Sequence, residues 1–196
     1  MSSTRTVGGS PPAFAAAVTA IGDVRLRSEI VLAEMPAPAR IAPWAVALTG
    51  DVVQHGDELA TGRFILLHDP SVPEEWGGDF RVVSYARADL EAEMGADPML
   101  GQVGWSWLEE ALAEAGAAAA GVGGTVTRVL SEGYGALAHR EASVDVELRA
   151  SWTPRPGADG TLDVGAHLKA WGDLLCTVAG LPPLPEGVSA LGRRPR

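Results

Sequence analysis

The sequence predicts an α+β fold, with one antiparallel sheet of about five strands and three helices packed on one face. Polar and apolar residues alternate without a break over 143–152. This period of two is typical of a strand with one buried face and one solvent-facing face. Apolar residues recur at helical spacing in three other segments, which begin near Pro11, Gln102 and Val164. In chain order, the segments predict the arrangement α-β-β-β-α-β-β-α.

Length and charge limit the domain organisation and the class of partner. At 196 residues, the chain is expected to form one domain over 10–181, with a disordered N-terminus (1–9) and a Pro/Arg-rich tail (182–196). A formal net charge of −10 disfavours binding to nucleic acid or to an anionic membrane surface. The sequence shows no signal peptide and no apolar stretch of about 20 residues, so we expect a cytoplasmic protein.

The first helix is predicted to have Ser10 as its N-cap and to end at Gly22. A strand is expected over 30–34, followed by a Pro-rich loop that reaches Pro43 and cannot pair regularly. Residues 44–48 fit either a short strand or a helical turn, and the sequence leaves this choice open.

Four further strands are predicted at 63–68, 79–87, 125–132 and 143–152. The second helix spans about 102–115, and the Ala/Gly-rich segment 116–124 after it is interpreted as a linker. The glycines of this segment follow a helix and precede a strand, which is the reverse of the order that presents backbone amides to phosphate. Asp163 is expected to cap the third helix and Gly180 to end it.

The residues offer no metal site and no activated nucleophile. The histidines lack partners at the spacings typical of metal ligands and are expected in surface loops or at strand ends; they are His55, His68, His139 and His167. The single cysteine, Cys176, lies on an apolar helix face, where an unreactive buried thiol is the ordinary state. We therefore predict no metal, no cofactor and no catalytic residue.

The long connection between the two predicted central strands is the first candidate site. Its carboxylates include Asp69, Glu74 and Asp79. Paired carboxylates serve as general acid and base when one of them is desolvated. Arg81 or Arg87 on the adjoining strand would then pair with an anionic group of a ligand. The competing interpretation is that an acidic loop simply keeps the protein soluble.

Two tryptophans form the second candidate site. Trp105, Trp152 and Trp171 fall on predicted core positions. Trp76 instead lies in a polar loop, and Trp107 lies about a quarter-turn from the core stripe of its helix. Exposed aromatic side chains are typical anchors of binding surfaces. Partial burial under a neighbouring loop would account for them equally well.

Four short blocks of sequence carry a resemblance to a known family. They are FILLHDP (64–70), DFRVVS (79–84), GWSWL (104–108) and AWGDLLC (170–176). They resemble an uncharacterised actinobacterial family, the domain of unknown function number 3000, from Phe14 to about Val188. The resemblance implies a cytoplasmic protein with no assigned activity and gives no catalytic residue. The element order is also similar to that of type III secretion chaperones, which is an analogy of fold alone.

Two functions stay open at this point. The first is a non-enzymatic protein-binding, adaptor or chaperone-like module that engages a protein partner, or a second copy of itself, through Trp76 and Trp107. The second is an enzyme or small-ligand binder that uses the loop from Asp69 to Asp79, which predicts a deep pocket and a raised carboxyl pKa.

The solvent-facing side of the sheet receives less weight. Its strands place Asp145, Glu147 and Arg149 near Arg81 and Arg87. Opposite charges at cross-strand positions are expected to satisfy one another. This pairing would explain the charges without a ligand.

Overall fold

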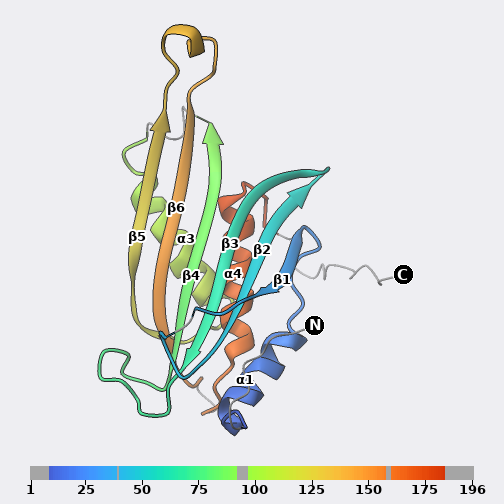
Figure 1. The fold of residues 1–196 in the computed structure, drawn as a ribbon, viewed down its shortest axis with the longest axis vertical. Coiled ribbons are helices and arrows are strands. Elements are labelled where there is room, and N and C mark those ends of the chain that lie inside the picture. Colours follow the sequence, from blue (N-terminus) through green and yellow to red (C-terminus); the bar gives the residue numbers. More distant parts are fainter. Residues whose placement is uncertain (1–8, 39, 92–96, 158–159, 184–196) are drawn as a thin grey trace.

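The computed structural model describes residues 9–38, 40–91, 97–157 and 160–183, and these residues form a single sheet with helices on one side (Figure 1). The helices are α1 (Pro12–Asp23), α3 (Leu100–Glu114) and α4 (Val164–Val178). Across the antiparallel sheet, the strands are β1 (Ile30–Met35), β2 (Trp44–Gln54), β3 (Asp57–His68), β4 (Phe80–Glu91), β6 (Ser143–Pro154) and β5 (Ala119–Ser131). The α+β fold is confirmed, and the sheet has six strands rather than about five.

The additional strand comes from the segment whose conformation the sequence left open. Residues 44–48 begin β2, which pairs with β3 along its whole length and makes the order α-β-β-β-β-α-β-β-α. The turn between β2 and β3 is His55-Gly56, with φ values of 56° and 98°. Two consecutive residues at positive φ are typical of the tight turns that join right-twisted strands.

Side chains alternate between the two faces of the sheet. On β4, Phe80, Val82 and Ala86 are buried on the face that the helices cover, which we call the core face. On the opposite side, which we call the open face, Arg81 is half-buried and Arg87 is exposed. The prediction that Arg81 and Arg87 lie on the side of the sheet away from the core is therefore confirmed. In Figure 1, α3 and α4 lie behind the sheet, and α1 packs against α4.

Helix α4 lies close to the sheet because two glycines pair beneath it. Gly50 of β2 lies directly opposite Gly62 of β3. A Cβ atom on Gly50 would be 2.8 Å from the ring of Trp171, and one on Gly62 would be 2.6 Å from the carbonyl oxygen of Tyr85. The indole of Trp171 is fully buried above this glycine pair, and its Nε1 donates a hydrogen bond to the same Tyr85 carbonyl, at 3.2 Å.

Replacement of Gly62 by Ala is expected to destabilise the fold by about 2 kcal/mol, because the added methyl group would have to displace backbone and two packed side chains. Gly101→Ala in α3 is the matched control, since a Cβ there meets nothing within 4 Å. Helix propensity predicts that the control is neutral or slightly stabilising. Urea denaturation followed by circular dichroism measures both changes, and equal midpoints for the two variants would contradict the close approach of α4.

The glycine-rich segment predicted as a linker is part of a strand. β5 begins at Ala119, and its register with β6 shifts between Ala120 and Gly123, which marks a bulge. A Cβ atom on Gly124 would overlap the carbonyl oxygen of Arg149 in β6. Glycine is needed here because the two backbones approach closely. The linker interpretation was therefore wrong for 119–124, whereas 116–118 do connect α3 to β5.

The predicted cap of α4 and the glycines after α3 and α4 are confirmed, whereas both predicted ends of α1 are wrong, since this helix runs past Gly22 to Asp23. Asp163 caps α4 and accepts a hydrogen bond from the Ala166 backbone N–H at 3.0 Å, as predicted. Gly116 and Gly180, at φ values of 67° and 73°, follow the ends of α3 and α4. Ser10, however, is not the cap of α1. Pro11 occupies that position, and no side chain caps the helix. The first helical residue, Pro12, has no N–H that needs a partner. Of the predicted termini, residues 1–8 and 184–196 lie outside the described residues.

Candidate functional site

The predicted carboxylates of the loop between β3 and β4 lie at its base and on its exposed part. Asp69 and Asp79 meet at the base of the loop, where the Asp69 N–H donates to the Asp79 carbonyl oxygen at 2.8 Å. Hydrogen bonds from Ser71 hold the pKa of the Asp69 carboxyl below its usual value. Glu74 is exposed. A general acid at neutral pH needs the opposite shift, so the raised carboxyl pKa that the enzyme alternative predicts is not found at Asp69.

Trp76 and Arg81 are brought together by one hydroxyl group. Thr153 of β6 donates from Oγ1 to the carbonyl oxygen of Trp76 at 2.5 Å, and it accepts from Nη1 of Arg81 at 3.1 Å. The half-buried Trp76 therefore lies at the margin of the open face, beside the end of β6. The loop and Arg81 form one polar unit there.

Trp107 lies on the other side of the sheet. It is half-buried and packs against the main core and against a smaller apolar cluster of Leu100, Val144 and Val146. Val146 and Thr153 are seven residues apart on β6, or about 23 Å at the rise of a strand. Trp76 and Trp107 are thus near opposite ends of β6 and do not combine into one surface.

Arg81 holds a positive charge without a carboxylate partner in the described part of the chain. Its Nη2 donates to Ser151 Oγ at 2.7 Å, so that both of its partners, Ser151 and Thr153, are neutral hydroxyls. Burial lowers the pKa of the Arg81 guanidinium. A Cβ atom on Gly121 would be 3.5 Å from Nη1, so the glycine leaves this side of the guanidinium less covered.

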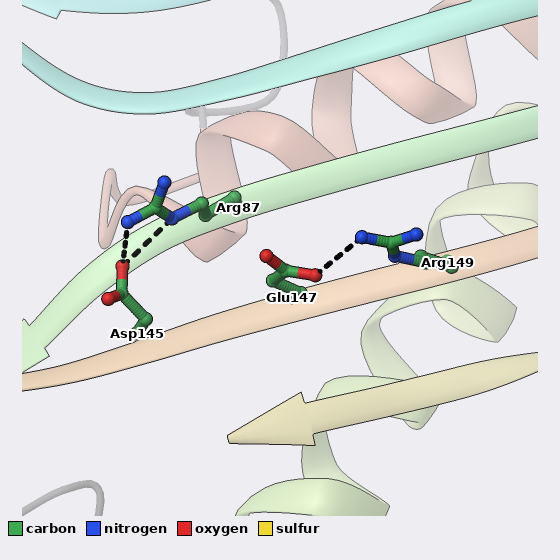
Figure 2. A network of polar contacts seen from close by, with 4 residues as sticks. All are labelled: Arg87, Asp145, Glu147 and Arg149. Atoms are coloured by element: carbon green, nitrogen blue, oxygen red, sulfur yellow. Dashed lines mark hydrogen bonds and ion pairs between the residues drawn. The ribbon is translucent and has the colours of Figure 1, made fainter. Parts of the chain in front are cut away.

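Ion pairs occupy the neighbouring part of the open face, as Figure 2 shows. Arg87 of β4 points toward β6 and donates through Nε and Nη2 to Asp145 Oδ1, at 2.8 and 2.5 Å. Along β6, Arg149 Nη2 lies 2.9 Å from Glu147 Oε2. Asp89 lies opposite Asp145 in register, and the hydrogen bond between them raises the pKa of Asp89 and lowers that of Asp145. The predicted cross-strand pairing is confirmed for Arg87.

A shallow hollow of about 390 Å³ lies on the other part of the open face. Its floor is apolar, because Ile65 of β3 lies directly opposite Val83 of β4. Its rim is positive, because Arg63 and Arg149 lie on either side of Tyr85 in register. The Arg149 guanidinium lies 5.2 Å from the centre of the Tyr85 ring.

The charges of the open face are unevenly distributed along the strands. Arg63, Arg81 and Arg149 belong to the half that contains the hollow, which we call the basic half. The other half, which we call the acidic half, contains Asp51, Asp89 and Asp145 as well as Arg87, and a second hollow of about 200 Å³ there is lined in part by Arg87 and Asp89. Glu147 lies at the boundary, opposite Arg87 in register and paired with Arg149. Although the chain has a net charge of −10, the basic half combines positive charge with apolar surface.

Neither a metal site nor a reactive thiol is present in the described residues. They contain no group of three or more His, Cys, Asp or Glu side chains that could hold a metal ion. Burial raises the pKa of the Cys176 thiol to about 11, so it is not a thiolate at neutral pH. His167 is buried within α4, contrary to the loop or strand-end position expected, whereas His68 is buried at the end of β3, a strand end as expected.

Residues 10–189 match the model of a protein family described as "Protein of unknown function (DUF3000)". This chain belongs to that family. Neither the curated proteins nor the solved structures gave a match. No helix of the described residues is long and apolar enough to cross a lipid bilayer. The family assigns no role to any residue, so the argument for function rests on the geometry of the open face.

Sequence reasoning missed two residues of the hollow, Arg63 and Ile65. The one signal in the sequence is Arg63 itself, because a charged residue at the start of an otherwise apolar strand favours the solvent-facing side. Ile65, two residues further along, then lies on the same side.

Proposed function

We propose that this protein is a non-enzymatic, cytoplasmic binding module that takes up a protein partner on the basic half of the open face. The observation that carries the proposal is the apolar floor of Ile65 and Val83, framed by Tyr85 and by Arg63 and Arg149. No described helix packs over these side chains.

The composition of the basic half supports protein recognition. Tyrosine and arginine are enriched at the energetically important positions of protein interfaces, where an apolar centre is surrounded by polar groups. The hollow is broad and open, which suits an extended segment of a partner better than an enclosed small molecule. Trp76 borders this surface through Thr153, whereas Trp107 stabilises the core side and has no part in the proposal.

Replacement of Ile65 by Asp is expected to abolish capture of the physiological partner. The change places a desolvated carboxylate in the centre of the apolar floor, and we expect recovery of the partner to fall by about tenfold or more. Affinity capture of the tagged chain from its own cytoplasm, with quantitative mass spectrometry, measures the difference between the variant and the natural chain.

Val103→Asp is the matched control, because Val103 is 39% exposed on α3, on the other side of the sheet. Recovery with this control should equal that of the natural chain. Thermal melts establish that both variants are folded. If the same proteins are recovered in equal amounts with Ile65→Asp and with Val103→Asp, the open face is not the binding surface.

A further inference from the structure

We infer that the partner segment is acidic and amphipathic, with carboxylates on both sides of an apolar side chain. This inference rests on the proposed function, because it names the chemistry that would occupy the basic half. Two features support it: the position of the arginines relative to the apolar floor, and the incomplete neutralisation of their charge.

The arginines lie at both ends of the apolar floor. In register across the sheet, one row holds Arg63, Tyr85 and Arg149. The next row along the strands holds Ile65 and Val83, and the row after that holds Arg81. Successive residues on one face of a strand are about 7 Å apart, so positive charge, apolar surface and positive charge follow one another at about 7 Å steps.

These charges are available to an incoming anion. Arg63 is exposed and has no ion-pair partner in the described part of the chain. Arg81 is bonded only to hydroxyl groups. The side chain of Arg149 is 64% exposed, and its interaction with Glu147 uses Nη2. A carboxylate that displaced water from these guanidinium groups would form charge-assisted hydrogen bonds, and partial burial of Arg81 would strengthen them.

The same spacing defines the conformation of the segment. Side chains at positions i, i+2 and i+4 of an extended chain point the same way and are also about 7 Å apart. An extended segment with Glu, Leu and Glu at these positions would place its apolar side chain on Ile65 and Val83 and its carboxylates toward the two groups of arginines. A nucleic acid would meet the same arginines, but it carries a charge on every nucleotide and would be repelled by the net charge of −10 more strongly than a segment with two carboxylates.

The test uses a labelled synthetic peptide with the core Glu-Ser-Leu-Ser-Glu and the full-length protein. Amide NMR titration detects weak binding and reports where the peptide lies. We expect shifts on β3 and β4 around Ile65 and Val83. Exchange of both glutamates for glutamine, or of the leucine for serine, should weaken binding by roughly tenfold or more. Raising NaCl from about 50 to about 500 mM should weaken binding of the acidic peptide far more than binding of the glutamine peptide.

Two double variants test whether the arginines of the basic half are responsible for peptide binding. The double variant Arg63→Gln/Arg149→Gln is expected to lose at least about tenfold in affinity for the acidic peptide. The matched control is Arg25→Gln/Arg140→Gln, which removes two exposed arginines that lie outside the strands of the sheet and should bind as the natural chain does.

Several results would overturn the inference. One is that the acidic peptide shows no detectable binding, and another is that the glutamine peptide binds equally well. A single-stranded oligonucleotide that binds more tightly, or a dimer that depends on Arg63 and Arg149, would overturn it too. If Ile65→Asp loses the captured partner while Arg63→Gln/Arg149→Gln retains it, the proposed function stands and the acidic chemistry is wrong. If Ile65→Asp retains that partner, the proposed function itself fails.

Discussion

Replacement of Trp171 by Ala is expected to lower the free energy of unfolding by about 3–5 kcal/mol. The indole is fully buried, and it fills the space above Gly50 and Gly62, which have no side chains that could move into the cavity. The substitution also removes the Nε1 donor from the Tyr85 carbonyl oxygen. The cost of a large-to-small change rises with the volume that remains empty, so this position should be near the upper end of the range.

Urea denaturation at constant protein concentration measures the loss. Trp105→Ala is the control, because Trp105 is also a helical tryptophan but is half-buried, with its Nε1 bonded to Glu109 Oε1 at 2.9 Å. We expect the free energy of unfolding of this variant to fall by about 1–2 kcal/mol. Trp171→Phe, which keeps an aromatic ring over the glycine pair, should fall between the two. Equal losses for Trp171→Ala and Trp105→Ala would show that the glycine pair does not set the position of α4.

The parts of the fold that could be predicted from the sequence are those in which local pattern and burial agree. β6 alternates along its whole predicted length, and its buried side chains include Val144, Val146 and Leu148. Helix α4 combines an Asp163 cap with an apolar stripe that is buried in the structure. In both elements, the residues that form the apolar pattern in the sequence are the residues that pack in the core.

The parts that could not be predicted depend on glycines used for close packing. Gly50 and Gly62 in the β2–β3 hairpin, and Gly124 in β5, resemble loop residues when only neighbours in sequence are considered. Their roles are set by distant residues: Trp171 covers the first two, and β6 passes directly beside the third. Glycine has a propensity for loops, but it is required within a strand wherever a larger side chain would keep two elements apart.

The sequence predicts some of the residues of the candidate site, but not how these residues pair in space. The sequence places Arg81 and Arg87 on one face of β4, and this is confirmed. Whether each arginine is neutralised depends on the register with β6, which sets Arg87 near Asp145 but gives Arg81 only Thr153 and Ser151. Registers between distant strands follow from packing and turn geometry that a single strand does not encode.

Acidification is expected to destabilise the protein through His167, mainly between about pH 6.5 and pH 4. The imidazole is buried in α4, and burial lowers the pKa of His167 to about 4. Its Nδ1 accepts a hydrogen bond from Trp152 Nε1 at 3.0 Å. An indole nitrogen can only donate, so protonation of Nδ1 would place two donors against each other.

The direction of the effect follows from the difference between the folded and unfolded pKa values of His167. Above about pH 6.5 the side chain is neutral in both states, and its full contribution to stability is present. As the pH falls toward 4, the unfolded chain takes up a proton that the folded chain does not, and up to about 3 kcal/mol is lost. His167→Gln retains an acceptor for Trp152 and does not titrate in this range. The free energy of unfolding, measured against pH by urea denaturation, should therefore fall more steeply for the natural chain than for the variant, and parallel curves would show that His167 is not held neutral by the fold.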